Sequence, residues 1–217
     1  MSRLMFITVM LTALIAAPQA SAGLLFHFTE EGEDVKMTAS GSIDTSGLVA
    51  SVDCNPGCEW FGTGFFDLGG SYLMGRHHIP TNEASFGFNT GTDLSPWQAG
   101  GPFTLNSTSH FSVYEDDGKT FSTVSVTEGG AAWDIGLAVN ADDLADDIWK
   151  TSQSWLAEDH TFETLGLIEG IYTITDAVSG ESMTIQVGVS VPEPATLGLL
   201  SIGLMGLAGI RRRRQAA

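Results

Sequence analysis

Carboxylates are the most abundant side chains in this sequence that could do chemistry. The 217 residues include 26 Asp and Glu. Two acidic groups, at 30–34 and 115–118, contain glycine and lie where turns are expected. Because calcium binds several oxygen ligands in such loops, Asp116 and Asp117 are candidate ligands. Neither group has the twelve-residue calcium-loop spacing, and solvated turns explain both. We therefore expect no cofactor, with calcium kept as an alternative.

No spacing in the chain is typical of a catalytic site. Adjacent histidines His77 and His78 would point to opposite faces of a strand, which is poor geometry for binding one metal. No HExxH pattern and no G-x-S-x-G turn occurs. Two carboxylates could hydrolyse a glycosidic bond, but the sequence does not single out a pair. We expect that the protein is not an enzyme.

The two cysteines, Cys54 and Cys58, lie in the sequence CNPGC. Pro56 presets φ and Gly57 accepts a positive φ, so the segment predicts a type II turn that brings the sulfurs together. The N-terminal segment described below predicts export, an exported chain meets oxidising conditions, and we therefore expect a disulfide here. Because its loop is so short, the disulfide would contribute only about 2 kcal/mol.

Aromatic side chains could either stack on sugar rings or fill a β-sheet core. We expect the core for most of them: Trp60, Phe61, Phe65, Phe66, Tyr72, Trp97, Trp133, Trp149 and Trp155. The glycine-rich stretch from Glu59 to Pro80 is too irregular for one strand, and we take it as the best candidate for an exposed functional loop.

The first 22 residues have the order of a secretory signal. A basic start containing Arg3 precedes an apolar run, and Ala20-Ser21-Ala22 is the small-x-small pattern that signal peptidase accepts. We expect cleavage after Ala22, so that the mature chain begins at Gly23.

The C-terminal tail has three parts. Pro192-Glu193-Pro194 excludes helix and central strand, and 16 uncharged residues then run from 195 to 210. A helix of that length covers about 24 Å, so it would span a membrane only marginally. Four arginines close it: Arg211, Arg212, Arg213 and Arg214. The positive-inside tendency keeps these arginines in the cytoplasm and the body outside.

In this order, the parts from Val191 to Gln215 resemble the sorting signal of the PEP-CTERM proteins of Gram-negative bacteria. The resemblance implies that Pro192, Glu193 and Pro194 are recognised by exosortase, a membrane-embedded, Cys-dependent, transpeptidase-like enzyme. It also implies that the arginines act as a cytoplasmic stop. The protein would be held at the inner membrane and then transferred to the cell surface or extracellular matrix, alongside exopolysaccharide. The resemblance implies nothing about the activity of residues 23–190.

The charge of the chain excludes nucleic acid as a partner. The formal net charge is −17, and five of the nine basic residues lie in the two terminal segments. A phosphate backbone requires a basic face, which the acidic body does not offer. The charge fits solubility and divalent-cation affinity.

Between the terminal segments, apolar alternation and turn signals predict strands. The clearest hairpin lies at 170–190, where Met183, Ile185, Val187 and Val189 face a core and their neighbours face water. A second hairpin is predicted with strands near 110–114 and 120–127. We expect an all-β fold, an antiparallel sandwich of jelly-roll type. We therefore divide the chain into three segments: a signal peptide at 1–22, one β-domain at 23–190 and the sorting signal at 191–217.

One segment breaks this pattern. Asn140 can cap a helix, acidic residues follow it, and Leu144 and Ile148 share a helical face. We expect a helix of two to four turns, ending near Trp155 or Leu156.

Three functions remain open for the body. The first is a structural or adhesive component of the surface or matrix. The second is a glycan-binding module, with or without calcium, and the third is a polysaccharide hydrolase.

Overall fold

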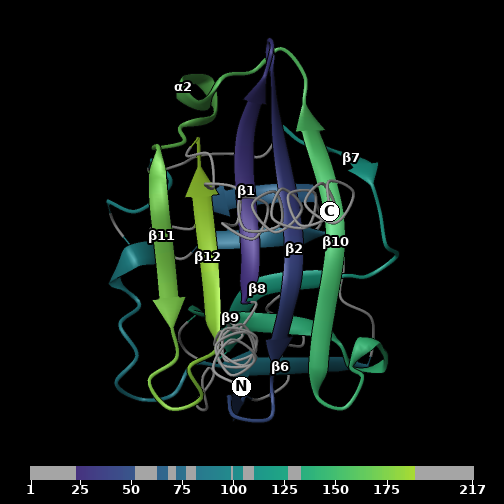
Figure 1. Cartoon of the computed structure of the whole chain (residues 1–217), viewed down its shortest axis with the longest axis vertical. Helices are drawn as coiled ribbons and strands as arrows, with labels where there is room; N and C mark the ends of the chain where they lie inside the picture. Colours follow the sequence, from purple (N-terminus) through teal and green to yellow (C-terminus); the bar gives the residue numbers. More distant parts are fainter. Residues whose placement is uncertain are drawn as a thin grey trace, which may run out of the picture.

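The computed structural model describes residues 23–51, 63–67, 72–76, 82–98, 100–104, 110–126 and 133–188. Strands dominate these ranges and form two six-stranded sheets. The first has the order β11 (Gly170–Thr175), β12 (Ser182–Val187), β1 (Leu24–Glu31), β2 (Asp34–Asp44), β10 (Ile148–Ala157), β7 (Ser112–Glu115). The second has the order β3 (Val49–Ala50), β6 (Glu83–Gly87), β9 (Trp133–Asn140), β8 (Phe121–Val126), β5 (Tyr72–Arg76), β4 (Thr63–Asp67). Figure 1 shows the strands of the second sheet running behind and across those of the first.

One hydrophobic core lies between the two sheets. Every second residue is buried from Leu24 to Phe28 in β1 and from Val35 to Ala39 in β2, because alternate side chains of a strand point to the same face. The other sheet contributes Phe121, and its ring centroid lies 5.8 Å from that of Phe26. The expectation of a mainly β fold is therefore confirmed, with two sheets and a few helical turns.

The hairpin predicted near the end of the body is confirmed as β11 and β12. Met183, Ile185 and Val187 are fully buried, while Val189 lies outside the described residues. Gln186 is an exception, because it was expected to face water and is only 3% exposed. Gln186 lies between His27 of β1 and Ile171 of β11, and its side-chain nitrogen is 3.4 Å from His27 Nε2.

The expectation of purely antiparallel sheets is wrong for one pair. β1 and β12 run parallel, with Leu24 opposite Met183 and Phe28 opposite Val187. The β1–β2 and β11–β12 hairpins are each antiparallel, as their turns dictate. How two hairpins join side by side is not set by either turn. It is decided by the core, which buries the apolar faces of both strands.

The second predicted hairpin is wrong as well. Strands form at 112–115 and 121–126, but β7 pairs with β10 in one sheet and β8 pairs with β9 in the other. The turn between them is therefore a crossing from one sheet to the other. Phe121 explains this placement, since its ring packs at 5.2 Å from Trp149 and 6.1 Å from Trp155 across the core.

The predicted helix after Asn140 is also wrong beyond its first turn. The Asn140 side chain accepts a hydrogen bond from Asp142 N and caps a single 3-10 turn, η2 (Ala141–Asp143). Asp146 and Asp147 then adopt positive φ, and the chain continues as β10. An extended β10 buries Trp149 and Trp155 and pairs with β2 over ten residues, which a helix could not do.

Three short helical segments complete the described fold: η1 (Ser95–Trp97), η2 and α2 (Phe162–Leu165). None of the helices in the described ranges is long and apolar enough to cross a membrane. The predicted spanning segment at 195–210 lies outside those ranges, as do the predicted signal peptide and the sorting signal. The proposed loop from Glu59 to Pro80 contains the antiparallel pair β4 and β5.

Candidate functional site

The end of β12 is where the described body stops and the C-terminal tail begins. Gly188 follows β12 directly, and its backbone N–H donates a 3.0 Å hydrogen bond to Phe28 O in β1. Its φ is +69°, a left-handed conformation that favours glycine. The chain is therefore tied to β1 at Gly188, and the regular strand β12 ends just before it.

Close packing adds a second reason for glycine at this position. A β-carbon on Gly188 would lie 2.9 Å from Phe162 Cε2 in α2 and 3.1 Å from Glu169 Cγ. Side chains rarely approach so closely, so any larger residue would force α2 or Glu169 to move. The exit point of the tail is thus fixed against α2.

The short helix α2 is held in place by capping at both ends. Thr161 and Thr164 form a reciprocal capping box, and Gly166 closes the helix with φ of +70°. Glu30 reaches over from β1, and its carboxylate accepts a 2.8 Å hydrogen bond from Phe162 N. Phe162 itself is buried against the core. The helix is thereby attached to the β1–β2 hairpin.

The segment after α2 is held by hydrogen bonds from Tyr172 in β11. The Tyr172 hydroxyl donates to the carbonyls of Ile168 and Glu169, at 3.2 and 3.3 Å. Burial raises the pKa of the Tyr172 phenol, so it stays protonated and able to donate at neutral pH. The Trp97 indole N–H in turn donates to Tyr172 O at 2.9 Å. These bonds hold Glu169 beside Gly188.

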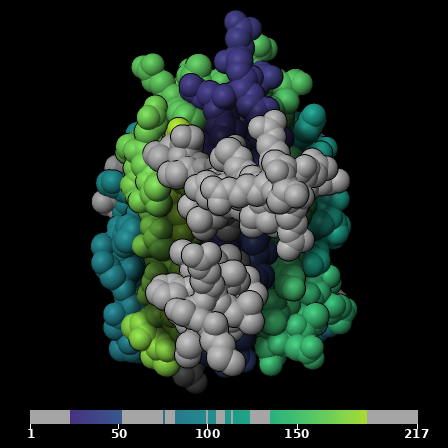
Figure 2. Space-filling view, viewed as in Figure 1, coloured from purple at the N-terminus to yellow at the C-terminus, as the bar shows by residue number. Residues whose placement is uncertain are grey.

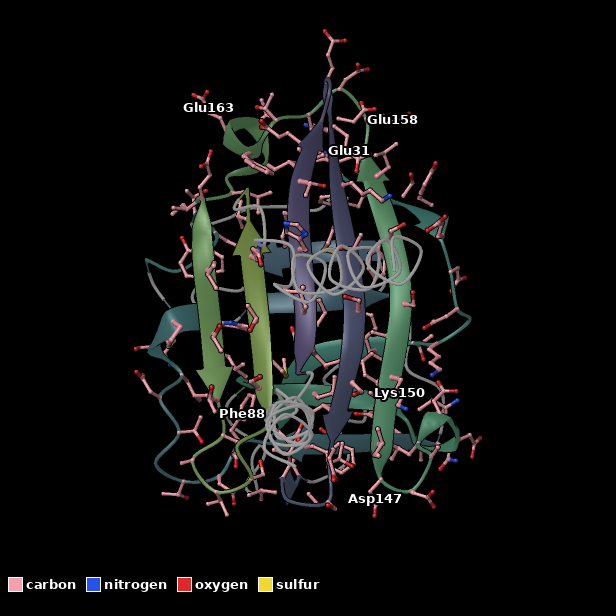
Figure 3. All side chains as sticks on the ribbon, viewed as in Figure 1. Glu31, Phe88, Asp147, Lys150, Glu158 and Glu163 are labelled. Atoms are coloured by element: carbon pink, nitrogen blue, oxygen red, sulfur yellow. The ribbon has the colours of Figure 1, made fainter. Side chains whose placement is uncertain are left out.

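Acidic side chains surround this exit. We call this region the α2 end. It consists of α2, the tip of the β1–β2 hairpin (30–34), the 158–160 turn, and Glu169 with the Gly188 that it contacts. Figure 3 shows Glu31, Glu158 and Glu163 together at this end, and Figure 2 shows the purple hairpin tip projecting beyond its neighbours. The carboxylates here are Glu30, Glu31, Glu33, Asp34, Glu158, Asp159, Glu163 and Glu169. His110 and His160 stack beside them, with ring centroids 4.6 Å apart.

The opposite end of β12 is built around one buried carboxylate. Asp176 is 2% exposed and accepts six hydrogen bonds, from Asn89, Thr92, Val178 and Ser179. Burial alone would raise the pKa of Asp176. The hydrogen bonds from Ser179, Asn89 and Val178 outweigh that effect and hold its pKa well below the usual range. We call this region, the 176–181 turn with Asn89 and Thr92, the Asp176 end.

The candidate calcium ligands accept hydrogen bonds from other residues of the protein. Asp116 accepts a hydrogen bond from Gly118 N, and Asp117 accepts from Lys119 N, Thr151 Oγ1 and Ser152 N. These bonds fix the crossing between β7 and β8. Within the described part of the chain, no three His, Cys, Asp or Glu side chains are grouped so as to hold a metal ion. The expectation of no cofactor stays a prediction, with calcium binding by Asp116 and Asp117 as its alternative.

Three of the candidate aromatic residues are described with their side chains, and all three lie in the core. Trp97, Trp149 and Trp155 are fully buried, so they are not placed to stack on a sugar at the surface. The backbones of Phe65, Phe66, Tyr72 and Trp133 lie in strands, whereas Trp60 and Phe61 lie outside the described residues. The core interpretation is therefore confirmed for the three described indoles.

A comparison with protein families decides what the tail is. The family model of the PEP-CTERM protein-sorting motif matches residues 190–214. This chain carries a PEP-CTERM sorting motif. The match begins two residues after Gly188, so the motif follows the β-domain almost without a linker. No curated protein and no solved structure matches the chain.

The PEP-CTERM motif supports an exported protein that is anchored in the membrane and then processed by exosortase. Its predicted residues, from Pro192 to Arg214, lie outside the described residues, as do Ala20, Ala22, Cys54 and Cys58. Gly23, the predicted first residue of the mature chain, is described. It lies against Ser182, at the Asp176 end.

Sequence reasoning missed Gly188, α2 and Asp176. The alternation predicts Gly188 as a water-facing position of a continuing strand, although a glycine four residues before the first of two prolines can signal that a strand ends. The threonine cap of α2 was visible as Thr161 three residues before Thr164. No local signal separates Asp176 from the other acidic turn residues, because its donors come from residues 84 to 87 positions earlier as well as from its own turn.

Proposed function

We propose that the protein is an exported, non-enzymatic component of the cell surface or extracellular matrix, with a β-sandwich body that associates with exopolysaccharide. The observation that carries this proposal is the PEP-CTERM motif at 190–214, which supports processing by exosortase. Signal peptidase would act first, at Ala22, and exosortase second.

The composition of the body supports a structural role. Residues 23–190 contain 25 of the 26 Asp and Glu residues but only four of the nine Lys and Arg residues. This excess of negative charge favours solubility in a hydrated medium and self-repulsion between copies. The outward positions of the first sheet also carry many hydroxyl groups, among them Thr38, Ser40, Ser42, Ser152, Thr173 and Thr184. Hydroxyl groups are uncharged, and they can both donate hydrogen bonds to a polysaccharide and accept them from it.

The sorting step is tested by changing the motif. Replacing Pro192 and Pro194 with Ala should leave uncleaved protein in the inner membrane, and deleting the exosortase gene should give the same result. Thr196→Ala, just outside the tripeptide, is the matched control and should be processed normally. If the doubly substituted protein still leaves the cell with a normal mature C-terminus, the sorting assignment fails.

The matrix role needs a separate test. Mature protein should co-fractionate with extracellular polysaccharide and be released when that polymer is digested. A protein that distributes identically in a strain without the polymer would contradict the matrix role. Selective binding of residues 23–190 on a glycan array would support the glycan-binding alternative. Turnover of the polysaccharide, abolished by a single carboxylate change, would support a hydrolase instead.

A further inference from the structure

The chain between the folded body and the sorting tripeptide is too short to separate them. Four residue steps lead from Gly188 to Pro192. A fully extended chain covers at most about 3.6 Å per residue, so Pro192 lies within about 14 Å of Gly188 in any conformation.

The starting point of this tether does not move independently of the fold. Gly188 is bonded to Phe28 O, and a β-carbon there would collide with Phe162. The strand before it, β12, is paired along its length with β1 and β11. Freeing more tether would require β12 to separate from both neighbours, which would detach β11 and β12 from the rest of the sheet.

An enzyme that acts on the tripeptide therefore has to approach the α2 end. A protein–protein contact of ordinary size covers about 800 Å² on each partner, a patch with a radius of about 16 Å. That radius exceeds the reach of the tether, so the patch around the tripeptide includes part of the α2 end. The opposite end of β12 lies a further 20 Å or so away, since six strand residues separate the two ends.

We infer that the α2 end is the surface on which exosortase docks, and that the enzyme processes the tail of an already folded body. The inference rests on the proposed processing by exosortase. Exosortase is the occupant because it has to reach the tripeptide, which the short tether keeps beside the α2 end. An enzyme face that is basic or uncharged fits this surface.

Photocrosslinking in cells tests the inference with the full-length chain and an exosortase that lacks its catalytic cysteine. A photoreactive residue replaces Glu163 at the α2 end, Val178 at the Asp176 end, or Ala195 just after the tripeptide. Glu163 and Val178 are both exposed, so the pair differs mainly in position. Unchanged melting temperatures show that the variants fold.

The expected result is crosslinking to exosortase from positions 195 and 163, with position 178 at background. A flexible Gly-Ser insertion of twelve residues after Ser190 adds a root-mean-square length of about 20 Å. It should abolish the difference between positions 163 and 178 while position 195 still crosslinks. The insertion thus controls for the contribution of the tether.

Two outcomes would contradict the inference or the function on which it rests, and they can be told apart. If position 195 captures the enzyme but positions 163 and 178 behave alike at the natural spacing, the body is not folded against the enzyme and the docking inference is overturned. If position 195 captures no enzyme either, the proposed processing itself fails.

Discussion

The two ends of β12 hold the chain by different means. At the Asp176 end the chain reverses, and a buried carboxylate with six hydrogen bonds ties the 176–181 turn to Asn89 and Thr92. At the α2 end the chain leaves the body, and a glycine turn and a four-residue capped helix hold it. Buried polar bonding locks one end, whereas the other end relies on close packing around a residue without a side chain. The predictions below test this difference.

Loss of the Asp176 carboxylate should have the largest effect. Asp176→Ala removes the acceptor of six hydrogen bonds and leaves buried donors without a partner, so we expect the free energy of unfolding to fall by about 3 kcal/mol. Urea denaturation of residues 23–190 measures it. Asp93→Asn is the control, since Asp93 is exposed and, among the described residues, accepts from Ser95 alone, and should cost about 0.5 kcal/mol or less. Equal costs at the two positions would show that Asp176 does not lock its end.

Gly188→Ala should have the next largest effect, about 2 kcal/mol, because left-handed strain and a close contact with Phe162 act together. The matched control is Gly180→Ala at the Asp176 end. Gly180 has φ of +76° but nothing within 4 Å of its β-carbon position, so strain alone should cost about 1 kcal/mol. Thermal or urea unfolding of both variants gives the comparison. If the two substitutions cost the same, packing against α2 does not fix the tail exit.

Removal of the helix cap should have a smaller and local effect. Thr161→Ala deletes the side chain that accepts from Thr164 N and should cost about 1 kcal/mol. Hydrogen exchange should accelerate at 162–166, with no change at the Asp176 end. Thr161→Ser keeps the hydroxyl and should behave like the parent protein. Faster exchange at both ends would mean that the ends are not independent.

The two ends should also respond differently to acid. The pKa of Asp176 is lowered in the folded state, so its contribution to stability is complete above the unfolded-state value of about 4 and is lost as the pH falls below that value. Between pH 7 and pH 5 we expect no change from this group. Below pH 4 the unfolding free energy should decline more steeply in the parent protein than in Asp176→Asn. Parallel pH profiles for the two proteins would rule out this linkage.

Local sequence patterns predicted the elements whose partners lie nearby in the chain. The 170–187 hairpin was predictable, because its turn and its alternation of Met183, Ile185 and Val187 lie within one short segment. The Asn140 cap was predictable as well, since it needs only Asp142 two residues later. The length of the helix that follows was not, because the alternating burial of β10 depends on β2 about a hundred residues earlier.

The sequence by itself determined that this chain carries a sorting signal, because that motif is defined by the order of prolines, apolar residues and arginines along the chain. It also determined the mainly β character, through the two-residue period of its apolar side chains. Only the tertiary structure decided that β7 and β8 separate and that β1 runs parallel to β12. It alone placed Gly188, the last described residue before the tail, against α2, because that position depends on Gly188, Phe28 and Phe162 meeting across 160 residues of chain. Such contacts arise from the burial of a shared core, which no local pattern specifies.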